Sequence, residues 1–193
     1  IHATSGTPGL LSDLGEGFLR DVFYAGILES PLGGALVVEL EGRVAGFQTI
    51  SVDSDRLFAL LFRRRLGRTL RALAGAALRK PRVLVDFIQT VLVVRTDPAA
   101  EIRAETVSLE VAPEYQGVGL GFVLLQAGVN ELRARGARRI KARILVCNTA
   151  VERLYPPLGF RRGEPFRLHG RDWVMMILDH SGAGPSPGVD PEA

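Results

Sequence analysis

Residues 107–125 of the chain read VSLEVAPEYQGVGLGFVLL, and this stretch decides the fold. A strand predicted over 105–111 passes through a glycine-rich turn into a helix predicted over 120–135 and closed by Gly136. Glycines at 117, 119 and 121 remove side chains where the backbone turns sharply, and they expose successive N–H groups. The helix that follows begins with unpaired N–H groups and the positive end of its dipole. The turn therefore favours a phosphate or pyrophosphate, although a tight turn without a ligand has the same pattern.

Two other phosphate-binding motifs do not match the spacing of this turn. A dinucleotide-binding fold requires G-x-G-x-x-G, but Phe122, Val123 and Leu124 follow Gly121. A P-loop requires Gly-Lys-Ser or Gly-Lys-Thr, which the turn lacks. The spacing thus excludes both of these nucleotide sites here.

The rest of the chain predicts one mixed α/β domain over 10–180. Its length of 193 residues suffices to bury a core without disulfides or metals. We expect a flexible N-terminus over 1–9 and a disordered tail over 181–193, because both are poor in large apolar residues. Between them, the sequence first predicts one or two helices within 10–29 and then two strands, over 35–40 and 43–50, joined at Glu41-Gly42. A helix capped by Asp55 follows, with apolar residues at Phe58, Phe62, Leu66, Leu70, Leu73 and Ala77, and after Pro81 comes a helix over 83–94. The last predicted elements are a strand over 139–146, a short helix over 150–158, and a hairpin of 160–168 with 172–178.

Charge and hydropathy narrow the classes of function. The formal net charge of +3 is too small to predict nucleic-acid binding. The apolar stretch over 83–94 is about half of the ~20 residues that a membrane-spanning helix needs. The start of the chain lacks the layout of a signal peptide, and a lone Cys147 suits a reducing compartment. We therefore expect a cytoplasmic protein.

Two blocks of sequence resemble the GNAT acyltransferase superfamily. Gln116-x-x-Gly119-x-Gly121 is similar to its Q/R-x-x-G-x-G/A motif, and residues 148–160, NTAVERLYPPLGF, are similar to its second block, N-x(6)-Y-x-x-x-G-F. The blocks occur in the expected order, with a helix and a strand between them. The resemblance implies an α+β fold with a central mixed sheet flanked by helices. It also implies acetyl-CoA as co-substrate and leaves residues 55–97 as a helical insertion before the cofactor-binding strand.

The resemblance also assigns cofactor-binding roles. It implies that the backbone groups of Leu109 and Val111 bind the pantetheine arm, as a neighbouring strand would. It implies that the pyrophosphate lies against Gln116, Gly117, Val118, Gly119, Leu120, Gly121 and Phe122. Asn148 is expected to bind the arm as well, and the alternative role of Asn148, capping the next helix, is compatible with that contact.

Two catalytic residues follow from the chemistry and the resemblance. Tyr155 is the predicted general acid, since a phenol can protonate the thiolate that leaves. Pro156 and Pro157 depart from the family pattern, and we expect them to end the helix early and shift the hydroxyl. Glu105 lies eleven positions before Gln116 and resembles the catalytic glutamate of the histone-type branch. Glu110 is the alternative base, facing the same side as Ser108 and opposite to Leu109 and Val111.

Other reactive residues carry no predicted chemistry. No histidine is near Cys147 in the sequence, so we expect Cys147 to pack rather than to act as a nucleophile. His2, His169 and His180 lack metal-ligand spacing, and no metal site is predicted.

The basic insertion leaves three hypotheses open. Arg64, Arg68 and Arg71 recur at helical spacing within 55–82, and they form a solvated face, an anion-recruiting lid over the acceptor, or a contact with a membrane surface. The overall pattern resembles GNAT members linked to surface-sugar pathways. The sequence thus predicts direct acetyl transfer to the amine of a small molecule, such as an amino sugar or a nucleotide-linked sugar. The alternatives are a non-catalytic CoA-binding module or a peripheral membrane-surface protein on the same fold, and a homodimer remains open.

Overall fold

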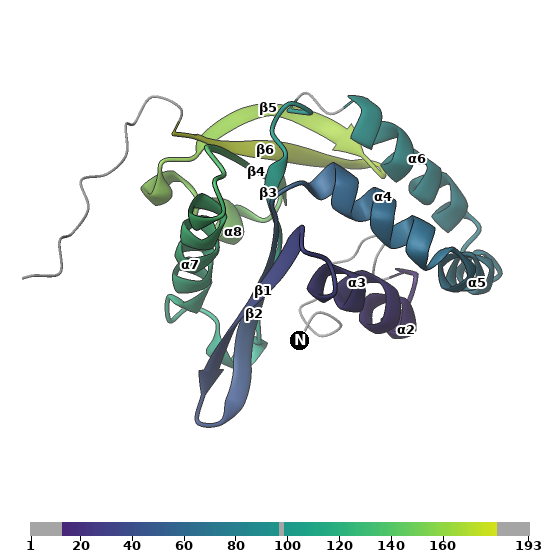
Figure 1. Ribbon diagram of the computed structural model, residues 1–193, viewed down its shortest axis with the longest axis horizontal. Coiled ribbons are helices and arrows are strands. Elements are labelled where there is room, and N and C mark those ends of the chain that lie inside the picture. The colour runs from purple at the N-terminus through teal and green to yellow at the C-terminus, as the bar shows by residue number, and fades with distance from the viewer. Residues whose placement is uncertain (1–12, 97–98, 181–193) are drawn as a thin grey trace, which may run out of the picture.

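The computed structural model describes residues 13–96 and 99–180, and the side chains of all of these except 90–96. Its centre is a six-stranded sheet of order β1-β2-β3-β4-β6-β5, which confirms the predicted central mixed sheet (Figure 1). Only the β3–β4 pairing is parallel, and the four other pairings are antiparallel. The strands are β1 (Gly33–Leu40), β2 (Arg43–Ser51), β3 (Ala104–Val111), β4 (Arg139–Leu145), β5 (Arg161–Leu168) and β6 (Arg171–Asp179).

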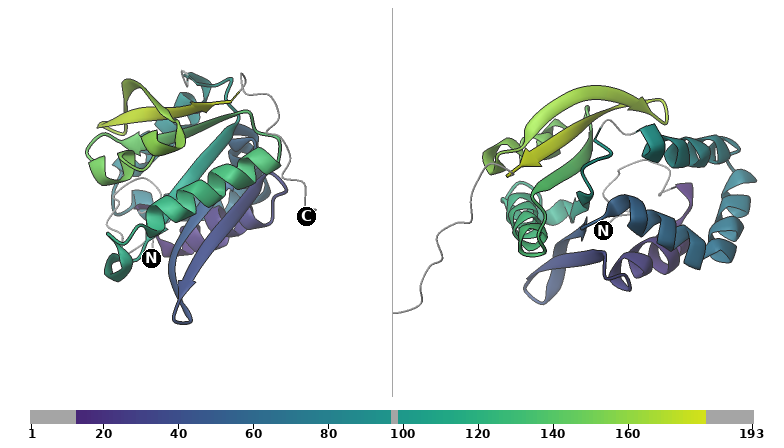
Figure 2. Two further views of the ribbon diagram at one scale, coloured as in Figure 1. Left: turned by 90° about the vertical axis from the view of Figure 1, so that its left-hand side faces the viewer. Right: turned by 45° about the horizontal axis from the view of Figure 1, so that its top comes forward.

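Helices cover both faces of this sheet (Figure 1). On one face lie α7 (Leu120–Ala134) and the short α8 (Thr149–Glu152), and Figure 2 shows α7 crossing the strands. On the other face lie the N-terminal helices and three helices between β2 and β3. Each face has its own core. The α7 side packs Ile50, Leu125, Val129, Leu132, Ile140, Ile144, Tyr155, Phe160, Met176 and Leu178, whereas the other side packs Leu14, Phe18, Val22, Phe23, Ile27, Leu57, Leu61, Leu73 and Val83.

Strand β3 is irregular in two ways. Its pairing with β2 steps from Thr49↔Ser108 to Ile50↔Thr106, which leaves Val107 as a bulge. Its parallel pairing with β4 consists of Ala104↔Ile140 and Glu105↔Lys141 alone. From Thr106 onward β3 and β4 therefore part, and we call this point the fork.

The N-terminal helices fall within the predicted range but are not regular. They comprise α2 (Glu16–Phe18), the π-helix η1 (Leu19–Tyr24) and α3 (Ala25–Leu28). The wider π-helical turn sets the direction of Tyr24, and such turns occur frequently at functional sites.

The expected helix from Asp55 is wrong in its cap and in its continuity. Asp53 caps α4 (Ser54–Arg64), because its carboxylate accepts a hydrogen bond from the backbone N–H of Arg56. The chain breaks at Arg65, whose guanidinium pairs with Glu29 and also donates to a backbone carbonyl of the N-terminal helices. Helix α5 (Leu66–Ala77) then starts a new register, and α6 (Arg82–Thr96) follows it.

This break changes the buried face of α5. The residues that α5 buries are Thr69, Leu73 and Ala76. Leu66 and Leu70, which the predicted apolar stripe included, are exposed instead. The stripe assumed one continuous helix, and the kink at Arg65 rotates the following residues.

The two ends predicted to be loose, 1–9 and 181–193, lie outside the described residues. Within 13–96 and 99–180, no helix combines the length and the apolar character that a bilayer crossing requires.

Gly33 tests the packing of β1 against the N-terminal helices. A Cβ at Gly33 would collide with the backbone carbonyl of Ile27, which cannot move without shifting α3. We expect Gly33→Ala to lower the free energy of unfolding by about 1–3 kcal/mol in urea titrations. The control is Gly75→Ala in α5, where a Cβ meets nothing within 4 Å. That change should stabilise the helix by about 0.5–1 kcal/mol, and equal losses in both variants would contradict the packing.

Candidate active site

The glycine turn connects the end of β3 to α7. A 3-10 turn, Pro113–Tyr115, leads into it, and the Gln116 side-chain amide donates to the Val111 carbonyl over 3.0 Å. Gly117 and Gly119 have φ of 82° and 89°, in the left-handed region that residues with a Cβ rarely adopt. A Cβ on either glycine would meet nothing within 4 Å, so both positions are open on the outside of the turn.

The turn offers unsatisfied donors. Gly119 is the N-cap of α7, and no side chain caps this helix end. Among the described residues, the N–H groups of 117–121 make no hydrogen bond to another group, while those of Phe122 and Val123 both donate to the Gly119 carbonyl. Because Gly117, Val118 and Gly119 are exposed, these donors face solvent. We call residues 116–122 the amide seat, and its chemistry is that of an anion site.

Asn148 lies at the start of α8, on the far side of the fork. Its side-chain oxygen accepts from the Val151 N–H over 3.3 Å, so the capping role is confirmed. The cap uses the carbonyl oxygen and leaves the side-chain NH₂ group as a donor. Contact of that NH₂ group with a cofactor arm stays a prediction.

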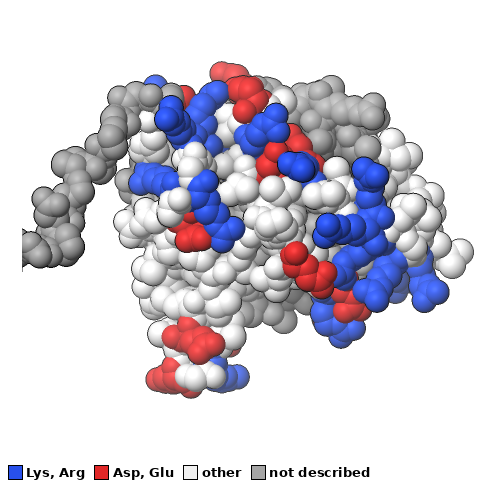
Figure 3. All heavy atoms as spheres, in the orientation of Figure 1, with Lys and Arg blue, Asp and Glu red and all other residues white. Residues whose placement is uncertain are grey.

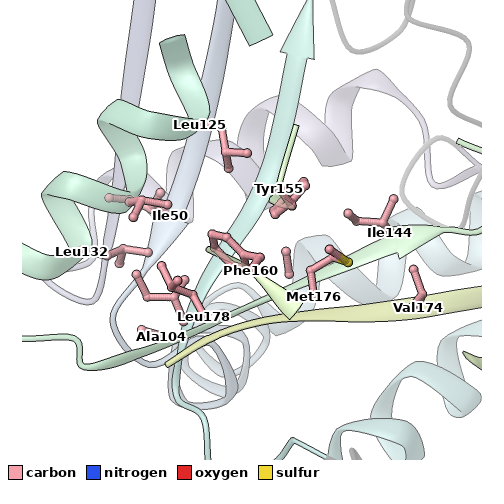
Figure 4. Packing of buried hydrophobic residues seen from close by; sticks show 13 residues of the cluster. Ile50, Ala104, Leu125, Leu132, Ile144, Tyr155, Phe160, Val174, Met176 and Leu178 are labelled. Carbon is pink, nitrogen blue, oxygen red and sulfur yellow. The ribbon is translucent and has the colours of Figure 1, made fainter. Parts of the chain in front are cut away.

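Tyr155 is positioned where the two strands part. Helix α8 ends at Glu152, and Pro156–Leu158 form a 3-10 turn, so the prolines do end the predicted helix early. The ring packs edge-on against Phe160, with 5.0 Å between centroids, beside β3 (Figure 4). Its hydroxyl lies 3.4 Å from the Thr106 hydroxyl, at the first residue beyond the last β3–β4 pair. The general acid predicted from sequence is therefore at the fork.

The environment of Tyr155 keeps its hydroxyl protonated. The side chain is 3% exposed. Burial, with a smaller effect from the Glu105 charge, raises the pKa of Tyr155 to about 12, and the Thr106 hydrogen bond opposes the shift. A phenol that is neutral at all ordinary pH values has a proton to donate.

Glu105 and Glu110 differ in their surroundings. Glu105 is 3% exposed and pairs with Arg143 over 3.3 Å, beside the fully buried Lys141. Burial and this ion pair give Glu105 surroundings unlike those of a glutamate on the solvent-exposed side of a sheet. Glu110 is 8% exposed and lies at the other end of β3, near the amide seat. Its charge acts on Tyr24, on the face of the sheet opposite α7.

That face holds a polar and aromatic cluster around Ser108. The hydroxyls of Ser108 and Thr49 are 2.6 Å apart. Tyr24 packs edge-on against Phe47, with centroids 5.4 Å apart, and hydrogen-bonds to Ser108. Burial, and then the Glu110 charge, raise the pKa of Tyr24 well above its usual range. Tyr24 is the last residue of the π-helix η1, which no periodicity in the sequence indicates.

Cys147 corrects one prediction. It is exposed rather than packed, because β4 ends at Leu145 and the following residues turn outward. Of the histidines, His169 lies in the β5–β6 turn, His180 contacts Arg133, and His2 is outside the described residues. No group of three or more His, Cys, Asp or Glu with metal-binding potential occurs in the described part of the chain. The absence of a metal site nevertheless stays a prediction.

A cavity of about 310 Å³ lies at the opposite end of β3 from the amide seat. It is rich in arginine, and its lining is Val52, Glu101, Ile102, Arg103, Ala104, Arg135, Gly136, Ala137, Arg138 and Arg139. Because three of these arginines pair with Asp53, Glu131, Glu101 and Asp179, its charge is largely neutralised. The candidate active site is therefore the open fork and seat, not this cavity.

Comparison with known proteins identifies the family. Residues 10–160 match the family described as the Acetyltransferase (GNAT) family. The chain belongs to the GNAT acetyltransferase family. The glycine turn and the whole Asn148–Phe160 block thus lie inside a GNAT match that covers most of the chain.

Two similar sequences belong to longer proteins, and each match covers only a part of the relative. A mycothiol acetyltransferase of Thermobispora bispora is 38% identical over 79 residues, which are 41% of this chain and 27% of that protein. A second one, of Streptosporangium roseum, is 48% identical over 52 residues, or 27% of this chain and 15% of that protein. The chain therefore spans well under half the length of these relatives.

A solved structure supports the fold over nearly the whole described chain. SsHAT has a TM-score of 0.57 at 20% identity, covering 86% of this chain and 81% of that one. At this identity the likeness establishes the shared fold and nothing more specific.

The pKa of Tyr155 gives a test by stability. Because the folded-state pKa is raised from 10 to about 12, the neutral phenol stabilises the fold fully below pH 10, and this contribution is lost as pH rises through 12. The native protein should therefore lose about 2–3 kcal/mol more than Tyr155→Phe between pH 9 and 12 in urea unfolding. Parallel curves for the two proteins would contradict the buried hydroxyl.

Proposed function

We propose that this chain is an acetyl-CoA-dependent N-acetyltransferase that transfers the acetyl group directly to an amine of a small-molecule acceptor. The observation that carries the proposal is one strand, β3, with unsatisfied amide donors at one end and a buried phenol at the other. From Thr106 to Val111 the strand spans about 17 Å, at ~3.3 Å per residue. An extended pantetheine arm covers that length, so pyrophosphate and thioester reach the two ends together.

The amide seat suits the pyrophosphate of CoA. Its donors belong to residues 116–122, and no side chain fills the space around Gly117 and Gly119. Leu109 and Val111 lie on the edge of β3 that has no paired strand beyond Glu105, which fits binding of the amide-containing arm as an added strand. The NH₂ group of Asn148 is then a further donor across the fork.

The chemistry follows as a direct transfer. The acceptor amine, once neutral, attacks the thioester carbonyl, and the carbon–sulfur bond breaks as the carbon–nitrogen bond forms. Tyr155 donates its proton to the departing sulfur, and a carboxylate takes the proton that the amine loses. The products are an acetamide and free CoA, so atoms and charge balance.

Glu105 is the proposed base, and Glu110 remains the alternative. Glu105 lies next to the fork, close enough for its charge to act on Tyr155. Its carboxylate also pairs with Arg143 over 3.3 Å, and that contact holds the side chain in place next to the fork. Glu110 is further from Tyr155 but belongs to the Tyr24–Ser108 cluster, which argues for contact with the acceptor.

The acceptor cluster fits a hydroxyl-rich amine such as an amino sugar or a nucleotide-linked sugar. Tyr24 and Phe47 offer aromatic faces, Ser108 and Thr49 offer hydroxyls, and Glu110 offers a charge for an ammonium group. The relatives named for mycothiol acetylation support an acceptor of small-molecule class. A non-catalytic CoA-binding module is the alternative, and turnover decides between them.

The seat is tested by two glycines with the same backbone strain. Gly119 and Gly136 both have φ of 89°, and a Cβ on either meets nothing within 4 Å, but Gly136 ends α7 away from the seat. Alanine at either position should cost about 1–2 kcal/mol of stability. We expect only Gly119→Ala to weaken CoA binding in calorimetry, by about tenfold or more. Equal CoA affinity in the two variants would contradict the seat.

The acid and the base are tested by single substitutions. Tyr155→Phe should lower turnover by about tenfold to hundredfold without changing CoA affinity, since it removes only the proton. Glu105→Gln should lower turnover with little change in the KM for the amine, whereas Glu110→Gln should mainly raise that KM. The measurement is release of CoA thiol against a panel of amino sugars, amino acids and polyamines. CoA binding without thiol release from any amine would instead favour the binding module.

A further inference from the structure

Helices α5 and α6 expose an unusual number of large aliphatic side chains. Of the eleven large hydrophobic residues exposed among the described residues, six lie on α5, on the first half of α6 and at the turn between them. They are Leu66 (54% exposed), Leu70 (55%), Leu78 (90%), Leu84 (45%), Val85 (52%) and Ile88 (57%). Single exposed leucines are ordinary on protein surfaces, but a group of this kind marks a contact surface.

These residues are not an incomplete part of the core. Helix α5 already buries Thr69, Leu73 and Ala76 against the N-terminal helices. Helix α6 buries Val83 and packs Phe87 edge-on against Phe62, with 5.5 Å between centroids. On α6 the exposed Leu84, Val85 and Ile88 lie away from the side that holds Val83 and Phe87. On α5 the exposed Leu66 and Leu70 border the buried stripe that contains Leu73.

Positive charge surrounds this aliphatic face. Residues 54–89 contain nine basic residues and two acidic ones, a local balance of +7. Arg63, Arg64, Arg68 and Arg71 are exposed on α4 and α5. In Figure 3 the blue side chains gather over this part of the molecule, next to a white surface at its edge. We call this combined area the α5–α6 surface.

We propose that the α5–α6 surface binds an anionic lipid bilayer and lies in the plane of its headgroups. An amphipathic helix with arginines beside an aliphatic face matches the boundary between headgroups and acyl chains. Anionic lipids attract the arginines, and Leu78, Leu84 and Ile88 enter the acyl region. An acidic protein or a nucleic acid accounts for the arginines but gives no reason for six exposed aliphatic residues. The inference is independent of acetyl transfer, because the surface lies on helices outside the fork and the seat.

The test is co-sedimentation of the purified protein with vesicles. We expect pelleting with phosphatidylcholine vesicles that contain phosphatidylglycerol and about tenfold less with phosphatidylcholine alone, because the attraction is electrostatic at first contact. Raising the salt from about 0.1 M to about 1 M should release most of the protein. Absence of pelleting with the anionic vesicles at the lower salt would overturn the proposal.

Two serine variants separate lipid insertion from charge alone. Leu78→Ser/Leu84→Ser/Ile88→Ser should reduce pelleting about tenfold, since burial of apolar side chains contributes to interfacial binding. The matched control is Val37→Ser/Val44→Ser on the β1–β2 hairpin, where both valines are also exposed. Circular dichroism and thermal melting verify that each variant is folded. If the triple variant pellets as well as the native protein, the surface attracts polyanions in general, and the lipid proposal is wrong.

Discussion

Strand β3 is paired on both edges at Glu105 alone, and the candidate site depends on this constraint. Beyond Glu105 the strand keeps its ladder with β2, while β4 diverges from it. A strand edge with free backbone groups is a template for an extended ligand. The bulge at Val107 lies at this point and adds local twist to the strand. The same divergence makes room for Tyr155, which fills the gap from the α7 side and places its hydroxyl against Thr106.

The sheet separates two kinds of chemistry. The side of α7 and α8 carries the amide seat, Asn148 and Tyr155, which are the groups suited to holding a cofactor and protonating its sulfur. The opposite side carries Glu105, Ser108, Glu110 and Tyr24, which are suited to an amine and its hydroxyls. Alternation along β3 produces this division together with the bulge at Val107, which shifts the alternation by one residue and puts Glu105 on the same side as Ser108 and Glu110. The helices between β2 and β3 close the second side and present arginines and aliphatic side chains outward.

The glycine turn, most of the strands and the positions of Asn148 and Tyr155 can be predicted from the sequence, because each depends on local residue preferences. Gly117 and Gly119 have backbone conformations that favour glycine, so their positions in the sequence predict the turn without knowledge of tertiary contacts. The strands around it follow from alternation and turn residues. The positions of Asn148 and Tyr155 follow from the second motif, and the early end of α8 follows from its prolines.

The features that sequence reasoning missed depend on contacts distant in the chain. Arg65 breaks the helix because Glu29 and the N-terminal helices hold its side chain. Glu105 is buried because Arg143 of the adjacent strand neutralises it, and no local pattern encodes that pair. Tyr24 is directed by a π-helix whose sequence resembles any amphipathic helix. Cys147 is exposed because β4 ends at Leu145, one residue before the predicted end of the strand.

The central claim is that an acyl-CoA lies along the open edge of β3, with its pyrophosphate in the amide seat. Hydrogen exchange of the backbone amides with and without acetyl-CoA measures this directly, because bound N–H groups exchange more slowly. Saturating acetyl-CoA should slow exchange across residues 106–122 and leave α4 and α5 unchanged. Unchanged exchange over 106–122, or protection confined to the arginine-lined cavity around 135–139, would contradict the account.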